Sequence, residues 1–170
     1  MVNVTRAALP VLRRRRSGHI LQISSVGGRV GGSPGLGAYQ TAKFAVAGFS
    51  EVLANEVAPL GIRVTIVEPG GMRTGWAAGA VGAQASVGAD YQQTVGEGIR
   101  FRTGYAGNEP GDAARVARVL LDLVESGEAP RRLLIGSDAL ERARQHAVER
   151  SAEMDRWADV SRSTDFPATA

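Results

Sequence analysis

Apolar residues recur along the chain at two spacings, one typical of helices and one typical of strands. Apolar positions that return every three or four residues predict helices over approximately 2–12, 38–58, 112–125 and 138–157. Short apolar or β-branched runs bounded by glycine, serine or proline predict strands at 19–23, 63–67 and 133–135. Asp112 and Asp138 are the expected N-caps of the last two helices, and Gly127 follows the end of the first of these. The segment 72–108 is rich in glycine and alanine and predicts a loop with short helices.

The order of these elements, in which strands alternate with helices, predicts an α/β fold with a parallel sheet and right-handed crossovers. Ligands of such sheets bind beyond the carboxyl ends of the strands. Those ends are Ser24–Ser25, Glu68–Gly70 and Gly136–Ser137. We therefore expect the functional residues to gather at the first two ends and at the start of the helix between them.

The composition is that of an ordinary globular chain of 170 residues, with 44% hydrophobic and 22% charged residues. The absence of cysteine excludes disulfides and thiol nucleophiles, and the two histidines lie far apart, so we expect no metal site. No apolar run approaches the ~20 residues of a membrane span, and the first residues do not resemble a signal peptide. We expect a cytoplasmic protein that forms one unit over residues 1–160, followed by a loose tail over residues 161–170.

The densest charge is the run Arg13–Arg16, and the net charge is +3. A nucleic-acid-binding chain would spread such charge over a face and interleave it with aromatic residues. The run is short and follows a predicted helix, where cations complement the helix dipole. We interpret it as a solvated helix end and expect neither nucleic-acid nor membrane binding, although binding of nucleic acid or acidic lipid is the alternative interpretation.

Tyr39 and Lys43 stand four residues apart near the start of a predicted helix, so their side chains share one face. A tyrosine hydroxyl ordinarily ionises near pH ~10, which is too high for efficient proton exchange at neutral pH. A cation held beside such a hydroxyl favours the phenolate and makes the group a better acid and base. Most tyrosine–lysine pairs at this spacing are nevertheless ordinary helix surface.

Two serines strengthen the pattern, because Ser24 and Ser25 follow the preceding strand and can face the same crevice. A serine hydroxyl there could donate a hydrogen bond to a substrate oxygen while the tyrosine supplies the proton. Taken alone, two serines after a strand more often only begin a loop. The combination of serine, tyrosine and lysine is therefore what points to chemistry.

Three segments together resemble the short-chain dehydrogenase/reductase family. Gly18–Gly28 resembles its fifth strand and serine, Ala38–Phe44 its Tyr-x-x-x-Lys helix, and Ile62–Thr74 its sixth strand with the Pro-Gly loop. All three occur in the order of the family. The resemblance implies the C-terminal part of a doubly wound, Rossmann-like α/β fold, with three strands retained and helices on both faces.

The resemblance assigns catalytic roles to Ser25, Tyr39 and Lys43, with Ser24 the less favoured serine. It assigns cofactor contacts to Tyr39, Lys43, Pro69, Gly70, Met72 and Thr74. The cofactor would be NAD or NADP, and the substrate a small-molecule carbonyl or alcohol. Hydride would pass between the nicotinamide and the substrate carbon, with Tyr39 passing the proton and Ser25 steadying the oxygen.

The family pattern also includes a Thr-Gly-x-x-x-Gly-x-Gly turn, an Asn-Asn-Ala-Gly motif and a catalytic asparagine, none of which occurs here. Gly31, Gly35 and Gly37 imitate the spacing of the turn. They begin several residues after their strand, and Pro34 among them offers no amide to a phosphate. We therefore expect a truncated chain, weakly active or inactive alone, whose first strand has an exposed apolar edge.

Two functions remain open from the sequence. One is the oxidoreductase activity of the family. The other is a non-catalytic remnant that acts as a dimerisation or interaction module, because the helices equivalent to Thr5–Leu12 and to the one carrying Tyr39 commonly form the subunit interface in the family. Either reading makes a homo-oligomer the expected assembly.

Overall fold

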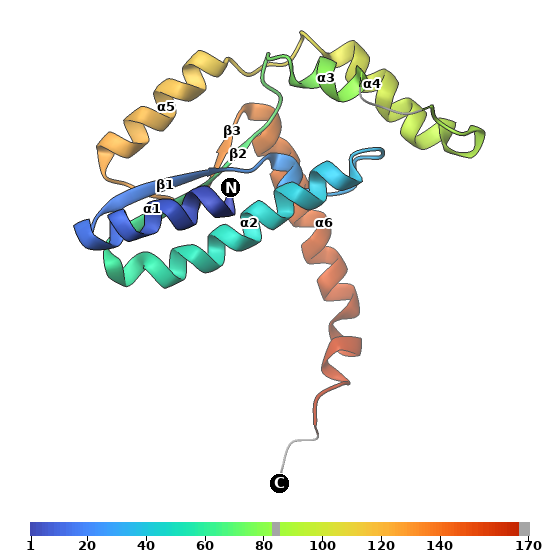
Figure 1. The fold of residues 1–170 in the computed structure, drawn as a ribbon. Coiled ribbons are helices and arrows are strands. Elements are labelled where there is room, and N and C mark those ends of the chain that lie inside the picture. Colours follow the sequence, from blue (N-terminus) through green and yellow to red (C-terminus); the bar gives the residue numbers. More distant parts are fainter. Residues whose placement is uncertain (83–85, 167–170) are drawn as a thin grey trace.

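The computed structural model describes residues 1–82 and 86–166, and helices and strands alternate along these ranges (Figure 1). The strands are β1 (Gly18–Ile23), β2 (Ile62–Pro69) and β3 (Arg132–Ile135). The longer helices are α1 (Val2–Arg15), α2 (Gly37–Val57), α5 (Ala113–Ser126) and α6 (Ser137–Arg162). Between β2 and α5 lie α3 (Trp76–Gly82), the turns η3 (Ala89–Tyr91) and η4 (Gln92–Gly96), and α4 (Glu97–Tyr105). Two further short turns are η1 (Val26–Gly28) and η2 (Ala58–Leu60).

The strands form one parallel sheet in the order β1-β2-β3. The ladder between β1 and β2 runs from Gly18 opposite Ile62 to Ile23 opposite Val67. The ladder between β2 and β3 ends with Pro69 opposite Ile135. β2 is buried at all but one of its positions, as expected for a central strand covered on both faces. The predicted α/β fold with a parallel sheet is thus confirmed.

The main core lies between the sheet and the pair of helices α1 and α2, which lie side by side in Figure 1. Its buried residues come from the last turns of α2 and the start of β2, and comprise Leu53, Ala54, Val57, Ile62 and Val64. Leu9 and Leu12 of α1 and Ile20 of β1 pack against them. In Figure 1 the sheet runs between this helix pair and α5, so helices flank it on both sides.

The boundaries of several elements differ from the predicted ones. α1 continues through Arg15, because the arginines extend the helix to a left-handed cap at Arg16. The N-cap of α6 is Gly136, and the predicted cap Asp138 instead accepts a hydrogen bond from the backbone N–H of Gly71 at 2.8 Å. That prediction was wrong because the acceptor is used by a loop 67 residues away in sequence.

α6 runs to Arg162, well past its predicted end near Trp157, and its second half extends away from the rest of the fold (Figure 1). Within α6 only Ala139 and Ala143, near its start, are buried. Val148, Met154 and Trp157 are exposed. The division into a unit over 1–160 and a tail over 161–170 stays a prediction.

β1 lies at one edge of the sheet, and the side of β1 that faces away from β2 pairs with no other described strand. Among the described residues β1 pairs with β2 alone, and Ile23 is 48% exposed. Unpaired strand edges invite association with another chain. Across the described ranges, helices that combine the length and the apolarity needed to cross a membrane are absent.

Candidate active site

Tyr39 and Lys43 lie on the first turns of α2, next to the carboxyl end of β1. The Lys43 Nζ is 5.8 Å from the centroid of the Tyr39 ring and donates a hydrogen bond to the carbonyl of Ile23 at 3.1 Å. Burial lowers the pKa of Lys43 from its ordinary value of 10.5. Lys43 is the only lysine in the sequence, where every other basic side chain apart from histidine is an arginine. A lysine can shift its pKa on burial, whereas an arginine remains charged.

The two adjacent serines have different environments. Ser24 is buried, and its hydroxyl donates a hydrogen bond at 2.8 Å to the carbonyl of Lys43, which ties β1 to α2. Gly28 allows this contact, because a Cβ there would lie 2.5 Å from the Ser24 Oγ and 2.6 Å from the Lys43 carbonyl oxygen. Ser24 therefore has a structural task.

Ser25 is only partly buried, and its hydroxyl faces the neighbouring loop. Its Oγ accepts a hydrogen bond from the backbone N–H of Gly27 at 3.0 Å and donates to the carbonyl of Pro69 at 3.5 Å. A Cβ on Gly27 would lie 3.5 Å from both the Ser25 Oγ and the Tyr39 Cε1. Ser25 and Tyr39 thus flank the same glycine, at the edge of the sheet where the sequence predicted them to meet.

Gln40 fixes the loop that precedes Tyr39. Its buried side-chain amide donates to the carbonyl of Val30 and accepts from the backbone N–H of Ser33, each at 3.3 Å. Both contacts join the start of α2 to the glycine-rich segment before it. The position of Tyr39 is therefore set by its own helix and by this neighbouring side chain.

The Pro-Gly loop after β2 is packed closely on the segments that follow it. Asp138 caps the amide of Gly71, and the carboxylate of Asp138 also lies against the Cα of Gly70. The hydroxyl of Tyr105 lies against the Cα of Gly71. Burial raises the pKa of Tyr105, and the nearby charges of Asp138 and Glu109 raise it further. These contacts leave little room for the loop to move.

Met72 faces Gly111 in a parallel bridge. The bridge uses the Gly71 carbonyl, which accepts from Gly111 at 2.9 Å, and the amide of Arg73, which donates to Gly111 at 2.9 Å. The amide of Met72 itself donates no hydrogen bond to any described residue. Its main chain is therefore free to meet a ligand.

Thr74 and Trp76 lie beyond the bridge. The Thr74 hydroxyl oxygen accepts from the Trp76 backbone N–H at 3.3 Å and retains its own hydrogen for donation. The Trp76 ring lies 5.0 Å from the Tyr39 ring, centroid to centroid, at an angle of 49°. Trp76 therefore packs against the candidate acid/base residue.

A charge network behind the site was missed from the sequence. Glu68 is fully buried directly before Pro69, and its carboxylate pairs with Arg29 at 2.7 Å and with Arg132 at 2.5 Å. Arg132 also pairs with Glu51 of α2 at 2.6 Å. The network joins the segment after Ser25 to β2, β3 and α2. The only sequence signal for it was a charged residue inside an apolar strand.

Comparisons with known proteins point to one family. Residues 1–84 match the family model described as short chain dehydrogenase. Oxidoreductase BOA17 of Botryotinia fuckeliana is 45% identical over 161 residues, which are 95% of this chain and 58% of that protein. A putative oxidoreductase, SadH, of Mycobacterium tuberculosis is 38% identical over 141 residues, or 82% of this chain and 47% of that protein.

One solved structure leads to the same family, and a second shares the fold. A short-chain dehydrogenase from Streptomyces avermitilis superposes with a TM-score of 0.83 and 36% identity, covering 97% of this chain and 59% of that one. A short-chain dehydrogenase from Burkholderia cenocepacia, solved in complex with NADP, shares the fold at a TM-score of 0.60 and 22% identity, over 91% of this chain and 53% of that one.

The chain belongs to the short-chain dehydrogenase/reductase family. It is similar over most of its length to proteins named as oxidoreductases, and it spans 58% of the length of BOA17. The fold and the family predicted from the sequence are thereby confirmed, whereas the roles of individual site residues stay predictions.

Proposed function

We propose that this chain carries the reaction centre of a nicotinamide-dependent oxidoreductase that acts on a small carbonyl or alcohol substrate. The observation that carries the proposal is the meeting of Ser25, Tyr39 and Lys43 at the carboxyl end of β1, beside the Pro-Gly loop. Parallel α/β sheets bind their ligands at this end.

Each of the three side chains has a role that its environment supports. The Tyr39 hydroxyl passes a proton to or from the substrate oxygen, and Ser25 donates a hydrogen bond to that oxygen. The positive charge of Lys43, held 5.8 Å from the Tyr39 ring centroid, stabilises negative charge that develops in the site during the reaction. By resemblance to the family, Lys43 also binds the nicotinamide ribose.

The Pro-Gly loop suits the carboxamide of a nicotinamide, which needs both donors and acceptors. The free main chain of Met72 and the hydroxyl hydrogen of Thr74 supply them. Pro69 and Gly70 form the start of the same loop, which Asp138 holds in place. When bound, the nicotinamide supplies or accepts the hydride. NAD and NADP both remain candidates.

The proposal is tested by assaying the concentrated chain for NADH- or NADPH-dependent reduction of a panel of aldehydes and ketones. We expect slow turnover that Tyr39→Phe abolishes, whereas Tyr91→Phe, which removes an exposed hydroxyl, retains it. Ser25→Ala should reduce turnover more than Ser24→Ala in protein that remains folded. Turnover that survives Tyr39→Phe would contradict the assigned acid/base role.

A second candidate function is a non-catalytic association module. Exposed apolar side chains on α1 and α2 favour it, namely Val4, Val11, Phe44 and Val52. Clusters of exposed apolar side chains mark interaction sites more often than isolated ones do. A chain that sediments as a dimer, binds neither reduced cofactor and turns over no substrate would favour this candidate over the first.

A further inference from the structure

The backbone of the Pro-Gly loop is held by three hydrogen bonds that its amides donate, and a side chain accepts one of them. The amide of Gly71 donates to Oδ2 of Asp138 at 2.8 Å. The amides of residues 70 and 73 donate to main-chain carbonyls, one in β3 and one at Gly111, at 2.8 and 2.9 Å. Among the described residues, Asp138 is thus the only side chain that accepts a hydrogen bond from the backbone of residues 70–73. It is the one acceptor of the three that a substitution can remove.

Met72 lies in the middle of this held segment, and its own main chain is turned the other way. The bridge to Gly111 uses the carbonyl of Gly71 and the amide of Arg73, which stand on either side of Met72. In a parallel bridge with this pattern, the N–H and C=O of the middle residue point away from the partner segment. The donor and the acceptor of Met72 are therefore presented on the side of the loop opposite Gly111.

The loop is also pressed closely by two separate helices. A Cβ on Gly70 would collide with the carboxylate of Asp138 in α6, and a Cβ on Gly71 would collide with the hydroxyl of Tyr105 in α4. Neither glycine has a positive φ, so glycine is required at these two positions for space and not for backbone conformation. The contacts fix two consecutive residues directly before Met72.

The position of Asp138 suits a charged acceptor. Asp138 lies in the first turn of α6, where the positive end of the helix dipole stabilises a carboxylate. Within the described ranges, no basic side chain lies at ion-pair distance from it. Hydrogen bonds accepted by a carboxylate are stronger than those accepted by a neutral group. The amide of Gly71 is therefore held by a carboxylate whose charge no ion pair neutralises.

We propose that Asp138 is a positioning residue for the nicotinamide: by holding the amide of Gly71, it keeps the main chain of Met72 in the orientation that meets the carboxamide. This inference rests on the proposed function, in which the Pro-Gly loop contacts that group. A loop that is fixed before its ligand arrives loses less conformational entropy on binding, so the ligand is bound more tightly.

The charge of Asp138 would by itself have the opposite effect on affinity. A nicotinamide dinucleotide carries negatively charged phosphates, so the loss of a nearby carboxylate should strengthen its binding on electrostatic grounds. The loss of the anchor of Gly71 should weaken its binding. Asp138→Ala therefore separates the two roles by the sign of the change in affinity.

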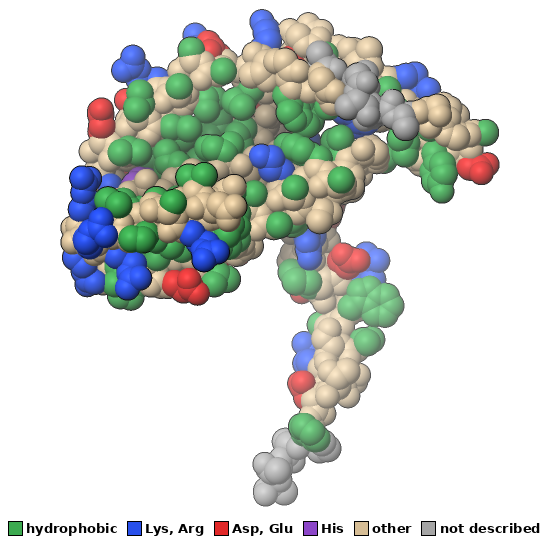
Figure 2. All heavy atoms as spheres, in the orientation of Figure 1, with side chains coloured by type: hydrophobic (Ala, Val, Ile, Leu, Met, Phe, Trp, Pro, Cys, Tyr) green, Lys and Arg blue, Asp and Glu red, His purple; other side chains and the backbone are tan. Residues whose placement is uncertain are grey.

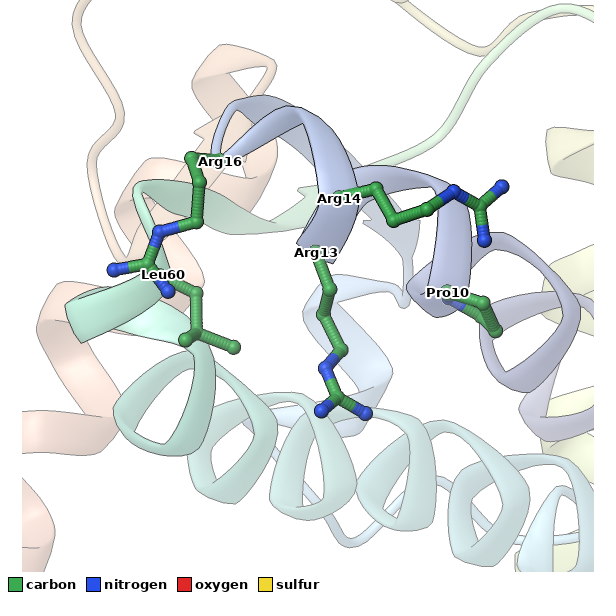
Figure 3. Close-up of a pocket in the computed structure, with 5 residues that line it drawn as sticks. All are labelled: Pro10, Arg13, Arg14, Arg16 and Leu60. Carbon is green, nitrogen blue, oxygen red and sulfur yellow. The ribbon is translucent and has the colours of Figure 1, made fainter.

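The arginines of α1 lie far from the Pro-Gly loop and provide a control for charge. Figure 2 shows basic side chains gathered at one end of the molecule, where α1 ends and β1 begins. A hollow of about 360 Å³ there is lined by Pro10, Arg13, Arg14, Arg16 and Leu60 (Figure 3). Its guanidinium groups point in different directions and converge on no common ligand. Because the Pro-Gly loop follows the opposite, carboxyl end of β2, Arg14→Gln changes the net charge without touching that loop.

The first measurement follows the amide of Gly71 by hydrogen exchange in the ¹⁵N-labelled chain without cofactor. Asp138→Ala should speed its exchange about tenfold or more, as expected for the loss of a hydrogen bond to a charged acceptor. Asp138→Asn keeps an acceptor oxygen and should retain most of the protection. Ser137→Ala, which changes an exposed residue of the same turn, should leave the exchange rate unchanged. Asp138→Ser, whose side chain is shorter but suits a helix start, replaces Asp138→Ala if that variant fails to fold.

The second measurement titrates the same variants with NADH and NADPH by cofactor fluorescence. Asp138→Ala should raise the dissociation constant about tenfold, and Asp138→Asn should remain within about threefold of the unaltered chain. Arg14→Gln should bind within about twofold, since diffuse surface charge contributes little. Val57→Ala removes buried contacts in the core at the far end of α2, and its folded form should bind as the unaltered chain does.

The outcomes distinguish this inference from the proposed function. If the unaltered chain binds neither cofactor, the proposed function fails and the inference fails with it. If the chain binds a cofactor and Asp138→Ala binds it equally or more tightly, only the positioning role is overturned. An exchange rate of Gly71 that Asp138→Ala leaves unchanged overturns it as well. Equal weakening by Asp138→Ala and Val57→Ala would do the same, because the loss would then reflect stability alone.

Discussion

Replacing Glu68 by glutamine removes one negative charge from between two arginines while preserving the shape of the side chain. The carboxylate has no exposed surface, and it forms ion pairs with Arg29 and Arg132. Loss of one partner from a buried pair costs about 3–5 kcal/mol, because the remaining charge is left uncompensated. The side chains of Arg29 and Arg132 are 32% and 24% exposed, so each guanidinium can recover some hydration.

The lower end of that range is therefore expected, and Glu68→Gln should reduce the free energy of unfolding by about 3 kcal/mol. For a chain of this size, that corresponds to a fall in melting temperature of about 6–12 °C. Urea unfolding followed by far-ultraviolet circular dichroism measures the change, provided that the transition is two-state.

Glu51→Gln is the matched control, since Glu51 pairs with the same Arg132 but its side chain is 46% exposed. An exposed ion pair contributes about 0–1 kcal/mol, so this variant should melt close to the wild type. The reasoning would be refuted if Glu68→Gln cost no more than Glu51→Gln. A double-mutant cycle with Arg29→Gln would show how much of the loss belongs to the Arg29–Glu68 pair.

Three further predictions follow from single residues. Gly28→Ala should destabilise the chain, because the new Cβ would collide with the Lys43 carbonyl. Gly48→Ala is the matched control: a Cβ at this position in α2 would contact no other atom, and the change should stabilise the chain by about 0.5–1 kcal/mol in the same urea titration. Asp112→Ala should cost about 1 kcal/mol, since Asp112 accepts hydrogen bonds from the first amides of α5, and equal stability would refute that cap. Lys43 is the only lysine, so reductive ¹³C-methylation allows its pKa to be followed by NMR, and burial should hold that pKa below 10.5. Because the folded chain then binds fewer protons at this group than the unfolded chain does, the group makes the stability rise with pH towards 10.5. A value at or above 10.5 would contradict this.

The elements that depend on neighbours along the chain could be predicted from the sequence. The periodicity of α2, the Asp112 cap and the left-handed Gly127 after α5 are all set within a few residues, and the structure has each of them. The spacing of Tyr39 and Lys43 is local in the same sense, because one helical turn brings them to one face. The carboxyl ends of β1 and β2 also meet as a parallel sheet requires.

The contacts that could not be predicted join residues far apart in sequence. Glu68 reaches Arg29 across 39 residues and Arg132 across 64, and no local pattern signals either partner. Asp138 was predicted to cap its own helix, but the sequence does not show that the amide of Gly71 lies within reach. The arginine run was predicted to be a solvated helix end, but the sequence does not show that the Arg16 side chain reaches the carbonyl of Pro59 in η2, because that contact depends on the fold.

The central claim is that Ser25, Tyr39, Lys43 and the Pro-Gly loop form the nicotinamide-facing part of an oxidoreductase site. Titration of the purified chain with NADH and NADPH, followed by cofactor fluorescence, tests it most directly. We predict weak but saturable binding of at least one cofactor that Lys43→Ala abolishes and Arg150→Ala, which removes an exposed charge on α6, preserves. Binding that Lys43→Ala leaves unchanged, or no binding of either cofactor at millimolar concentration, would contradict the claim.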